Sequence, residues 1–164
     1  DTVREYLEIP AAVQEVKSRT GPQYRLKIVR TSSVEMIVSI LESHGWQPRK
    51  AHERAYPTGS INDRGFIRAW VELHGSVDIR QAKDRKGNYH PQKRLRVYGN
   101  WSMLDDMNNT LCYATRLNPR TLQPTMGKVT KALYFQGSSV SKVIDWLYDG
   151  AEIWNPAARE RMVL

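Results

Sequence analysis

The residues best suited to chemistry are a cluster of basic side chains in the middle of the chain. Between Arg80 and Arg96 there is a single acid, Asp84. The seven basic residues of this stretch are Arg80, Lys83, Arg85, Lys86, Lys93, Arg94 and Arg96. Clustered positive charge of this kind attracts polyanions such as nucleic acid. Two interpretations fit the cluster: a phosphate-contacting ribbon, or a solvated hairpin tip with no ligand.

The sequence lacks the residue spacings of several common metal-binding and catalytic sites. The four histidines lack the spacing of metal ligands, and there is neither a glycine-rich phosphate loop nor a nucleophile elbow. Cys112 is the sole cysteine, which excludes a disulfide framework and a cysteine-rich zinc site. We therefore expect an intracellular protein, cytoplasmic or associated with the nucleoid, from a reducing compartment.

The composition suits a basic globular protein of one domain or two half-domains. The 164 residues have a formal net charge of +8, and 40% of them are hydrophobic, which is enough for a core. This charge favours polyanionic partners, although many basic proteins bind no nucleic acid. No apolar run approaches the ~18–20 residues of a membrane helix, so no membrane partner is expected. The chain begins at Asp1 rather than Met, which predicts a trimmed or omitted N-terminus.

A pattern with a period of about 70 residues repeats along the chain. Residues 25–28 (Arg-Leu-Lys-Ile) match residues 94–97 (Arg-Leu-Arg-Val), and both alternate basic and apolar side chains like half-buried strands. Each match is followed by a helix with an apolar stripe, at 33–43 and at 101–113, and then by a Pro-Arg step. The shared order of strand, helix and Pro-Arg indicates an internal duplication.

The second half of the chain contains a fuller series of predicted elements than the first. Its helices are predicted at 63–74, 101–113, 139–148 and 156–163, and its strands at 76–82, 93–98 and 129–136. The first half is predicted to contain a remnant strand at 3–9, a connecting loop at 10–22, a strand at 24–29 and a helix at 33–43. The counterpart of the 63–74 helix would fall at or before Asp1.

Alternation along the strands predicts which side chains face the core. Val77 and Ile79 are expected in the core, as are Leu133 and Phe135 on the last strand. The neighbours left facing outward are Asp78, Arg80, Ala82, Arg94, Arg96, Tyr98, Tyr134 and Gln136.

The most specific pattern lies at residues 65–77, Gly-Phe-Ile-Arg-Ala-Trp-Val-Glu-Leu-His-Gly-Ser-Val. It resembles the signature of the LAGLIDADG homing endonucleases, an apolar helix ending in acid-small-acid-Gly that leads directly into a strand. Residues 133–137 (Leu-Tyr-Phe-Gln-Gly) and 141–148 (Ser-Lys-Val-Ile-Asp-Trp-Leu-Tyr) resemble the last strand and helix of that family. The resemblance covers residues 62–160, and residues 20–50 through the duplication.

The resemblance implies an α+β fold of duplicated αββαββα units related by a pseudo-twofold axis. In this family the antiparallel sheets form a saddle that binds double-stranded DNA. Residues 1–60 would be a first, incomplete half and residues 61–164 a second, more complete half. Either a homodimer or an additional chain would then supply the missing first helix.

The acidic positions of the motif depart from the family's pattern. Glu72 occupies the first, and His74 occupies the second, which holds the metal ion in active members. Histidine is a poor ligand for Mg²⁺, and Glu72 lies about 200° away around the helix from the required direction. A polar helix end without a metal role is the plainer interpretation. We therefore expect no catalytic residue, no metal and no cofactor, with Mg²⁺ needed only if the protein cleaves DNA.

Three functions follow from the resemblance. The first is a double-stranded DNA-binding protein that has lost cleavage, such as a transcriptional regulator or repressor. The second is an active, divalent-metal-dependent, site-specific DNA endonuclease. The third is an RNA-binding maturase that assists intron splicing. In the first, the nucleic-acid-binding residues are predicted to be Arg25, Lys27, Arg80, Lys83, Arg85, Lys86, Lys93, Arg94, Arg96 and Tyr98.

Overall fold

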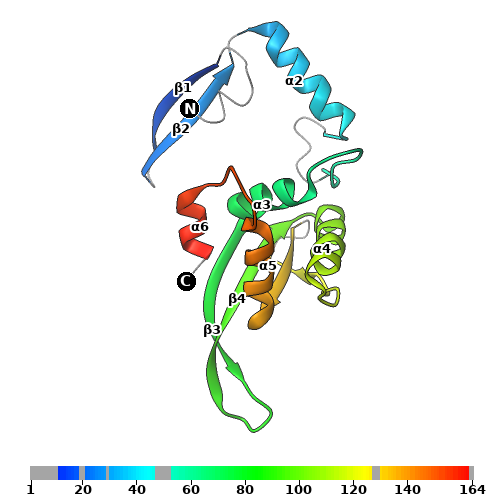
Figure 1. The fold of residues 1–164 in the computed structure, drawn as a ribbon. Coiled ribbons are helices and arrows are strands. Elements are labelled where there is room, and N and C mark those ends of the chain that lie inside the picture. Colours follow the sequence, from blue (N-terminus) through cyan, green and yellow to red (C-terminus); the bar gives the residue numbers. More distant parts are fainter. Residues whose placement is uncertain (1–10, 19–20, 29, 47–52, 127–129, 163–164) are drawn as a thin grey trace. The chain divides into compact units, whose positions relative to one another are not determined.

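The computed structural model describes residues 11–18, 21–28, 30–46, 53–126 and 130–162 (Figure 1). The chain divides into two compact units, residues 1–46 and residues 47–164. This division identifies parts of the chain that are each compact, and it does not test where the duplicated halves meet. The boundary of the duplicated halves at residue 60 remains a prediction.

The first unit consists of a β-hairpin followed by a helix. β1 (Ala11–Ser18) pairs antiparallel with β2 (Gly21–Ile28), with Ala11 opposite Ile28. The helix α2 (Thr31–Ser43) begins two residues earlier than predicted and ends where predicted.

The predicted connecting loop at 10–22 is wrong, because residues 11–18 of it form the strand β1. Strands that are adjacent in sequence usually pair with each other, and Val13 and Val16 favour extended backbone. The strand expected at 3–9 lies outside the described residues.

The second unit has the element order αββαββα, as the resemblance implied. Its elements are α3 (Asp63–His74), β3 (Gly75–Lys83), β4 (Tyr89–Gly99), α4 (Trp101–Thr115), β5 (Gln123–Pro124), β6 (Lys131–Gln136) and α5 (Ser138–Tyr148), followed by α6 (Pro156–Met162). The strands form one antiparallel sheet in the order β3-β4-β6-β5. The short β5 lies between the helix predicted at 101–113 and the strand predicted at 129–136, where no strand was predicted.

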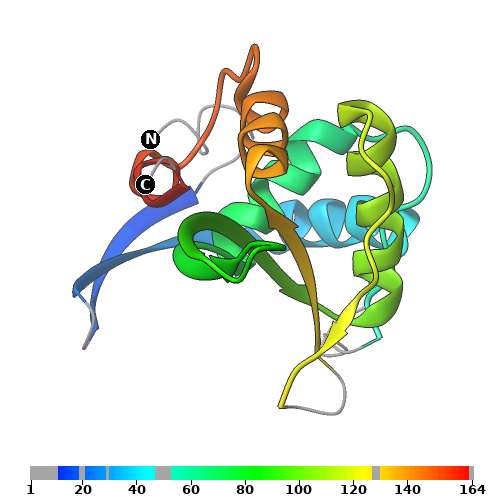
Figure 2. The ribbon, with the colours of Figure 1, turned by 90° about the horizontal axis from the view of Figure 1, so that it is seen from below.

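Helices cover one face of this sheet (Figure 2). The core is formed by α3, α4, α5 and α6 packed against the inward residues of β4 and β6. Leu133 and Phe135 are fully buried, as alternation predicted, while Tyr134 and Gln136 are half-buried on the opposite face. The inward-facing residues of the sheet therefore hold the helices in place, and among the described residues of this unit no helix covers the other face.

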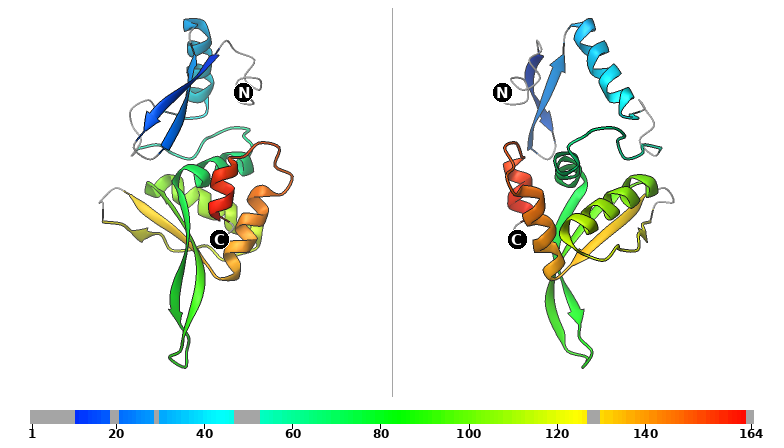
Figure 3. Two further views of the ribbon diagram at one scale, coloured as in Figure 1. Left: turned by 90° about the vertical axis from the view of Figure 1, so that its left-hand side faces the viewer. Right: turned by 45° about the vertical axis from the view of Figure 1, so that its right-hand side comes forward.

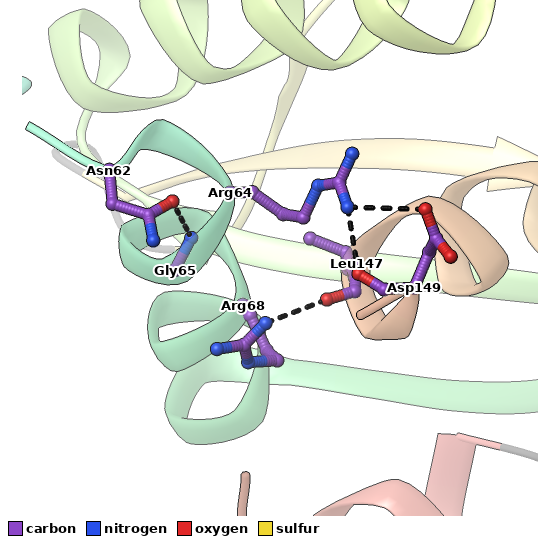
Figure 4. A network of polar contacts seen from close by, with 6 residues as sticks. All are labelled: Asn62, Arg64, Gly65, Arg68, Leu147 and Asp149. Atoms are coloured by element: carbon purple, nitrogen blue, oxygen red, sulfur yellow. Dashed lines mark hydrogen bonds and ion pairs between the residues drawn. The ribbon is translucent and has the colours of Figure 1, made fainter. Parts of the chain in front are cut away.

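Polar contacts fix α3 at both its start and its middle (Figure 4). The side chain of Asn62 caps the helix by accepting a hydrogen bond from the Gly65 amide at 3.0 Å. Arg64 donates to the Asp149 carbonyl at 2.7 Å, and Arg68 donates to the Leu147 carbonyl at 2.9 Å. These two arginines satisfy carbonyls at the end of α5, and they set the position of α3 relative to that helix.

The hairpin of β3 and β4 extends past the helices (Figures 1 and 3). Ile79 was expected in the core but is 62% exposed, because the helices that bury Val97 and Leu95 do not reach this far along the hairpin. Ala82, expected to face outward, is buried. Beyond the helices, alternation still separates the two faces of the ribbon but no longer predicts burial.

Candidate nucleic-acid interface

The helix-free face of the sheet has a defined set of polar side chains. The pairing register places Asp78 opposite Arg94 and Arg80 opposite Gln92. It also places Gln136 opposite Arg94 and Tyr134 opposite Arg96. Side chains of directly paired residues lie on the same face, so the predicted outward arginines of both strands do lie together. We call this set, Asp78, Arg80, Gln92, Arg94, Arg96, Tyr134 and Gln136, the polar sheet face.

A carboxylate holds two arginines of the polar sheet face. Arg94 donates to both Asp78 oxygens, at 3.0 and 2.8 Å, and Arg96 forms an ion pair with one of them at 2.9 Å. The hydrogen bonds from Arg94 lower the pKa of the Asp78 carboxyl below its ordinary value, with the charges of Arg94 and Arg96 adding to the effect. The same hydrogen bond raises the pKa of Arg94. The bidentate geometry fixes the orientation of the Arg94 guanidinium.

Amide and aromatic side chains also contact the arginines of this face. Arg80 donates to the Gln92 side-chain oxygen at 3.0 Å and to that of Gln136 at 2.7 Å. The guanidinium of Arg94 lies 5.6 Å from the ring centre of Tyr134. Each arginine of this face therefore has a fixed direction before any ligand arrives.

The tip of the hairpin differs from the polar sheet face, because its basic side chains point into solvent. Lys83, Arg85 and Lys86 are all exposed. Asp84 is committed to the turn, since its carboxylate accepts from the amides of Lys86 and Asn88, each at 2.8 Å. The hydrogen bond from the Asn88 amide is the main cause of the lowered pKa of Asp84. Asp84, the single acid of the basic stretch, therefore stabilises the turn that carries the exposed basic side chains.

The remaining predicted contacts lie in different places. Lys93 pairs with Ile79, which puts it on the side of the ribbon away from Arg94. Tyr98 is half-buried on the same face of β4 as Arg94 and Arg96, nearer the base of the strand, and its carbonyl accepts from the indole of Trp70 at 3.0 Å. Arg25 and Lys27 lie in β2 of the first unit, and Lys27 is exposed.

The carboxylate of Glu72 is occupied by bonds within the protein. One oxygen accepts from the Tyr148 hydroxyl at 3.0 Å, and the other accepts from the Asn155 amide at 3.1 Å. Burial, followed by the bond to Glu72, raises the pKa of Tyr148. Glu72 thus ties the end of α3 to the end of α5 and to the segment before α6.

His74 lies in surroundings unsuited to a divalent cation. Its ring packs against that of Trp70 in a tilted arrangement, with ring centres 4.5 Å apart. Burial and, secondly, the positive charge of Arg54 lower its pKa. A cation near this imidazole would meet a guanidinium rather than a carboxylate. Among the described residues, no three His, Cys, Asp or Glu side chains gather closely enough to hold a metal ion.

We predict that Glu72→Ala lowers the free energy of unfolding by about 1–3 kcal/mol, because the Tyr148 hydroxyl and the Asn155 amide lose a charged acceptor. Tyr148→Phe removes one of these bonds, so a double-mutant cycle in urea should give a coupling of about 1 kcal/mol. The control Glu160→Ala, at an exposed site in α6, should change stability by less than about 0.5 kcal/mol. An unchanged midpoint for Glu72→Ala would contradict a structural role.

Sequence reasoning missed the side chains that hold the arginines of this surface. Gln92 was not singled out, and Asp78 was given an outward direction but no role. Their importance depends on the register between β3 and β4, which composition does not reveal. A usable signal was the acid at 78 in a strand that faces two arginines, because opposite charges favour cross-strand pairing.

Comparison with solved structures identifies the fold. The LAGLIDADG homing endonuclease I-SmaMI bound to cleaved DNA matches 98% of this chain and 70% of its own, with a TM-score of 0.62 at 10% identity. The LAGLIDADG meganuclease I-AabMI bound to uncleaved DNA matches 96% of this chain and 72% of its own, with a TM-score of 0.59 at 12% identity. Structural matches at such low sequence identity show a shared fold and nothing more specific.

Sequence comparison alone is less informative. No protein-family model matches the chain, and no curated protein matches it. Within the described residues, every helix is too short or too polar to cross a membrane.

Proposed function

We propose that this chain, whose fold is that of the LAGLIDADG homing endonucleases, binds double-stranded DNA through the polar sheet face and the hairpin tip without cutting it. The observation that supports this most directly is the helix-free face of the sheet, with Arg80, Arg94 and Arg96 held in fixed directions. A duplex bound by such a protein would be blocked rather than cleaved, which suits a transcriptional regulator or repressor.

The geometry of the hairpin supports a duplex ligand. A two-stranded β-ribbon fits the major groove, where arginine can read guanine through two hydrogen bonds. Lysines and arginines at the exposed tip would contact phosphates instead. I-SmaMI and I-AabMI, the two structures compared above, are both described as bound to DNA.

The end of α3 supports loss of cleavage. Mg²⁺ prefers carboxylate oxygens with room for its waters, whereas Glu72 has both oxygens engaged and His74 packs against Trp70 near the charge of Arg54. The residues at this helix end therefore do not fit a magnesium site.

The exposed apolar part of α3 supports a partner helix. Leu73 is 76% exposed at the end of a helix whose other apolar residues are mostly packed. We propose that a second copy of the chain, or an additional chain, covers this position and completes the DNA-binding surface.

The test measures binding and cleavage separately. A labelled duplex library is titrated with protein in EDTA, bound sequences are recovered, and the preferred duplex is incubated with protein and Mg²⁺. We expect salt-dependent binding in EDTA and intact DNA with Mg²⁺. Nicking that disappears in Glu72→Gln would show an active endonuclease, and tighter binding to structured RNA than to duplex would favour a maturase. Either result overturns the proposal.

A further inference from the structure

A cavity of about 280 Å³ opens beside the polar sheet face. Its lining residues are Arg120, Thr121, Gln123, Tyr134 and Gln136. All five side chains can donate a hydrogen bond, and none is a carboxylate or a wholly aliphatic group. Such a lining suits an oxyanion, because the guanidinium of Arg120 repels a metal ion and no carboxylate is present to balance it, while an apolar ligand needs apolar walls.

The main chain of Arg120 is fixed by a buried side chain. The Arg120 amide donates to the Asn108 side-chain oxygen at 3.1 Å, and the Asn108 amide group donates to the Arg120 carbonyl at 2.8 Å. Asn108 is 2% exposed. The position of residue 120 therefore depends on α4, and it should survive a change of the Arg120 side chain.

The Arg120 guanidinium lacks an anionic partner among the described residues. Its Nη2 donates to the Ser139 hydroxyl at 3.0 Å, while its buried Nε has no hydrogen-bond partner. A partly buried cation without a counter-anion is unfavourable, and an unsatisfied buried N–H is uncommon in folded proteins. An anion in the cavity would compensate this charge.

The cavity adjoins the residues that direct the arginines of the sheet. Gln136, on its wall, accepts from Arg80, and Tyr134, also on its wall, lies under Arg94. A duplex on the polar sheet face would therefore lie next to the cavity. We infer that the Arg120 cavity binds a phosphate group, and that in the complex this group is a backbone phosphate of double-stranded DNA. The inference rests on the proposed function and extends its contact surface to the loop before β5.

The experiment compares three single variants in salt titrations of duplex binding followed by fluorescence anisotropy. Arg120→Gln removes the charge and keeps hydrogen-bonding groups, Arg120→Lys keeps the charge, and Ser139→Ala removes the hydrogen-bond partner of the guanidinium while leaving Arg120 in place. We expect Arg120→Gln to lower the slope of log affinity against log salt by about 0.9 and affinity by roughly fivefold at about 0.15 M salt. Arg120→Lys and Ser139→Ala should keep the wild-type slope. Thermal unfolding of each variant confirms that it is folded.

Two further results show whether the inference about the cavity is wrong alone or together with the proposed function. If Arg120→Gln keeps the wild-type slope while charge removal at the hairpin tip lowers it, the cavity is not a DNA contact and the proposed function stands. If the wild-type protein binds no duplex, both proposals fail. Inorganic phosphate, replacing chloride at equal ionic strength, probes a free-anion site. Protection against thermal unfolding in wild type but not in Arg120→Gln, without a change of slope, would assign the cavity to free phosphate and overturn its role with DNA.

Discussion

Changing Arg85 and Lys86 together to glutamine is expected to weaken duplex binding roughly thirtyfold at about 0.15 M salt. Both side chains are exposed at the hairpin tip, so each can neutralise one phosphate and release its counterion. Losing two such contacts should lower the slope of log affinity against log salt by about 1.8. The measurement is anisotropy with the same duplex at several salt concentrations. The change should affect all duplex sequences nearly equally, because phosphate contacts do not read bases.

The matched control is Lys142→Gln with Arg161→Gln, which removes one lysine and one arginine from exposed positions on α5 and α6. Its net charge equals that of the tip variant, so a long-range charge effect would lower affinity in both. We expect the control slope to stay close to that of wild type. Equal losses in the two variants would mean that the tip makes no local contact.

Asp78→Asn should have an effect of the opposite kind. Removing this charge frees Arg94 and Arg96, so binding to unselected duplex should strengthen, with a slope steeper by up to about 0.9. Discrimination between the preferred and a scrambled duplex should fall by roughly tenfold or more, because two arginines lose the orientation that base reading requires. Competition titrations with the two duplexes measure this ratio. Asp145→Asn, at an exposed site on α5, is the control for charge alone.

The same carboxylate predicts a pH dependence. The pKa of Asp78 is lowered in the folded protein, chiefly by the hydrogen bonds from Arg94. Its contribution to stability is therefore complete above the unfolded carboxyl pKa of about 4 and is lost as the pH falls through the lower folded value. Because Asp78 is partly exposed, the difference in unfolding free energy between wild type and Asp78→Asn should be modest at neutral pH and should vanish in acid. A difference that persists at low pH would assign it to packing rather than charge.

Much of the second unit could be predicted from local signals. The helix at 63–74 has the predicted bounds because Asn62 caps its start and the chain turns into a strand at Gly75. Alternation predicted which side chains of β6 face the core, because helices pack against one side of this strand. Strong local signals and the global fold agree in these segments.

What could not be predicted depends on distances between elements. The exposure of Ile79 follows from the length of β3 and β4 relative to the helices, and no window of sequence contains that comparison. The cavity at Arg120 requires the loop before β5 to meet β6, which is a contact between segments predicted separately. The role of Glu72 depends on Tyr148 and Asn155, more than seventy positions away. The sequence showed the type of each group but not its partner.

The junction between α3 and β3 constrains one main-chain position of this helix end and leaves the neighbouring side chains free of that constraint. A β-carbon on Gly75 would lie 2.4 Å from the Val71 carbonyl oxygen, so the chain can pass from helix to strand at that point only with glycine. The side chains of residues 72 and 74 take no part in this constraint. The side chain at position 74 can therefore change while the strands keep their places, whereas Glu72 is also held by its bonds to Tyr148 and Asn155. In a lineage under selection for binding alone, the glycine would be retained long after the side chain at position 74 has drifted.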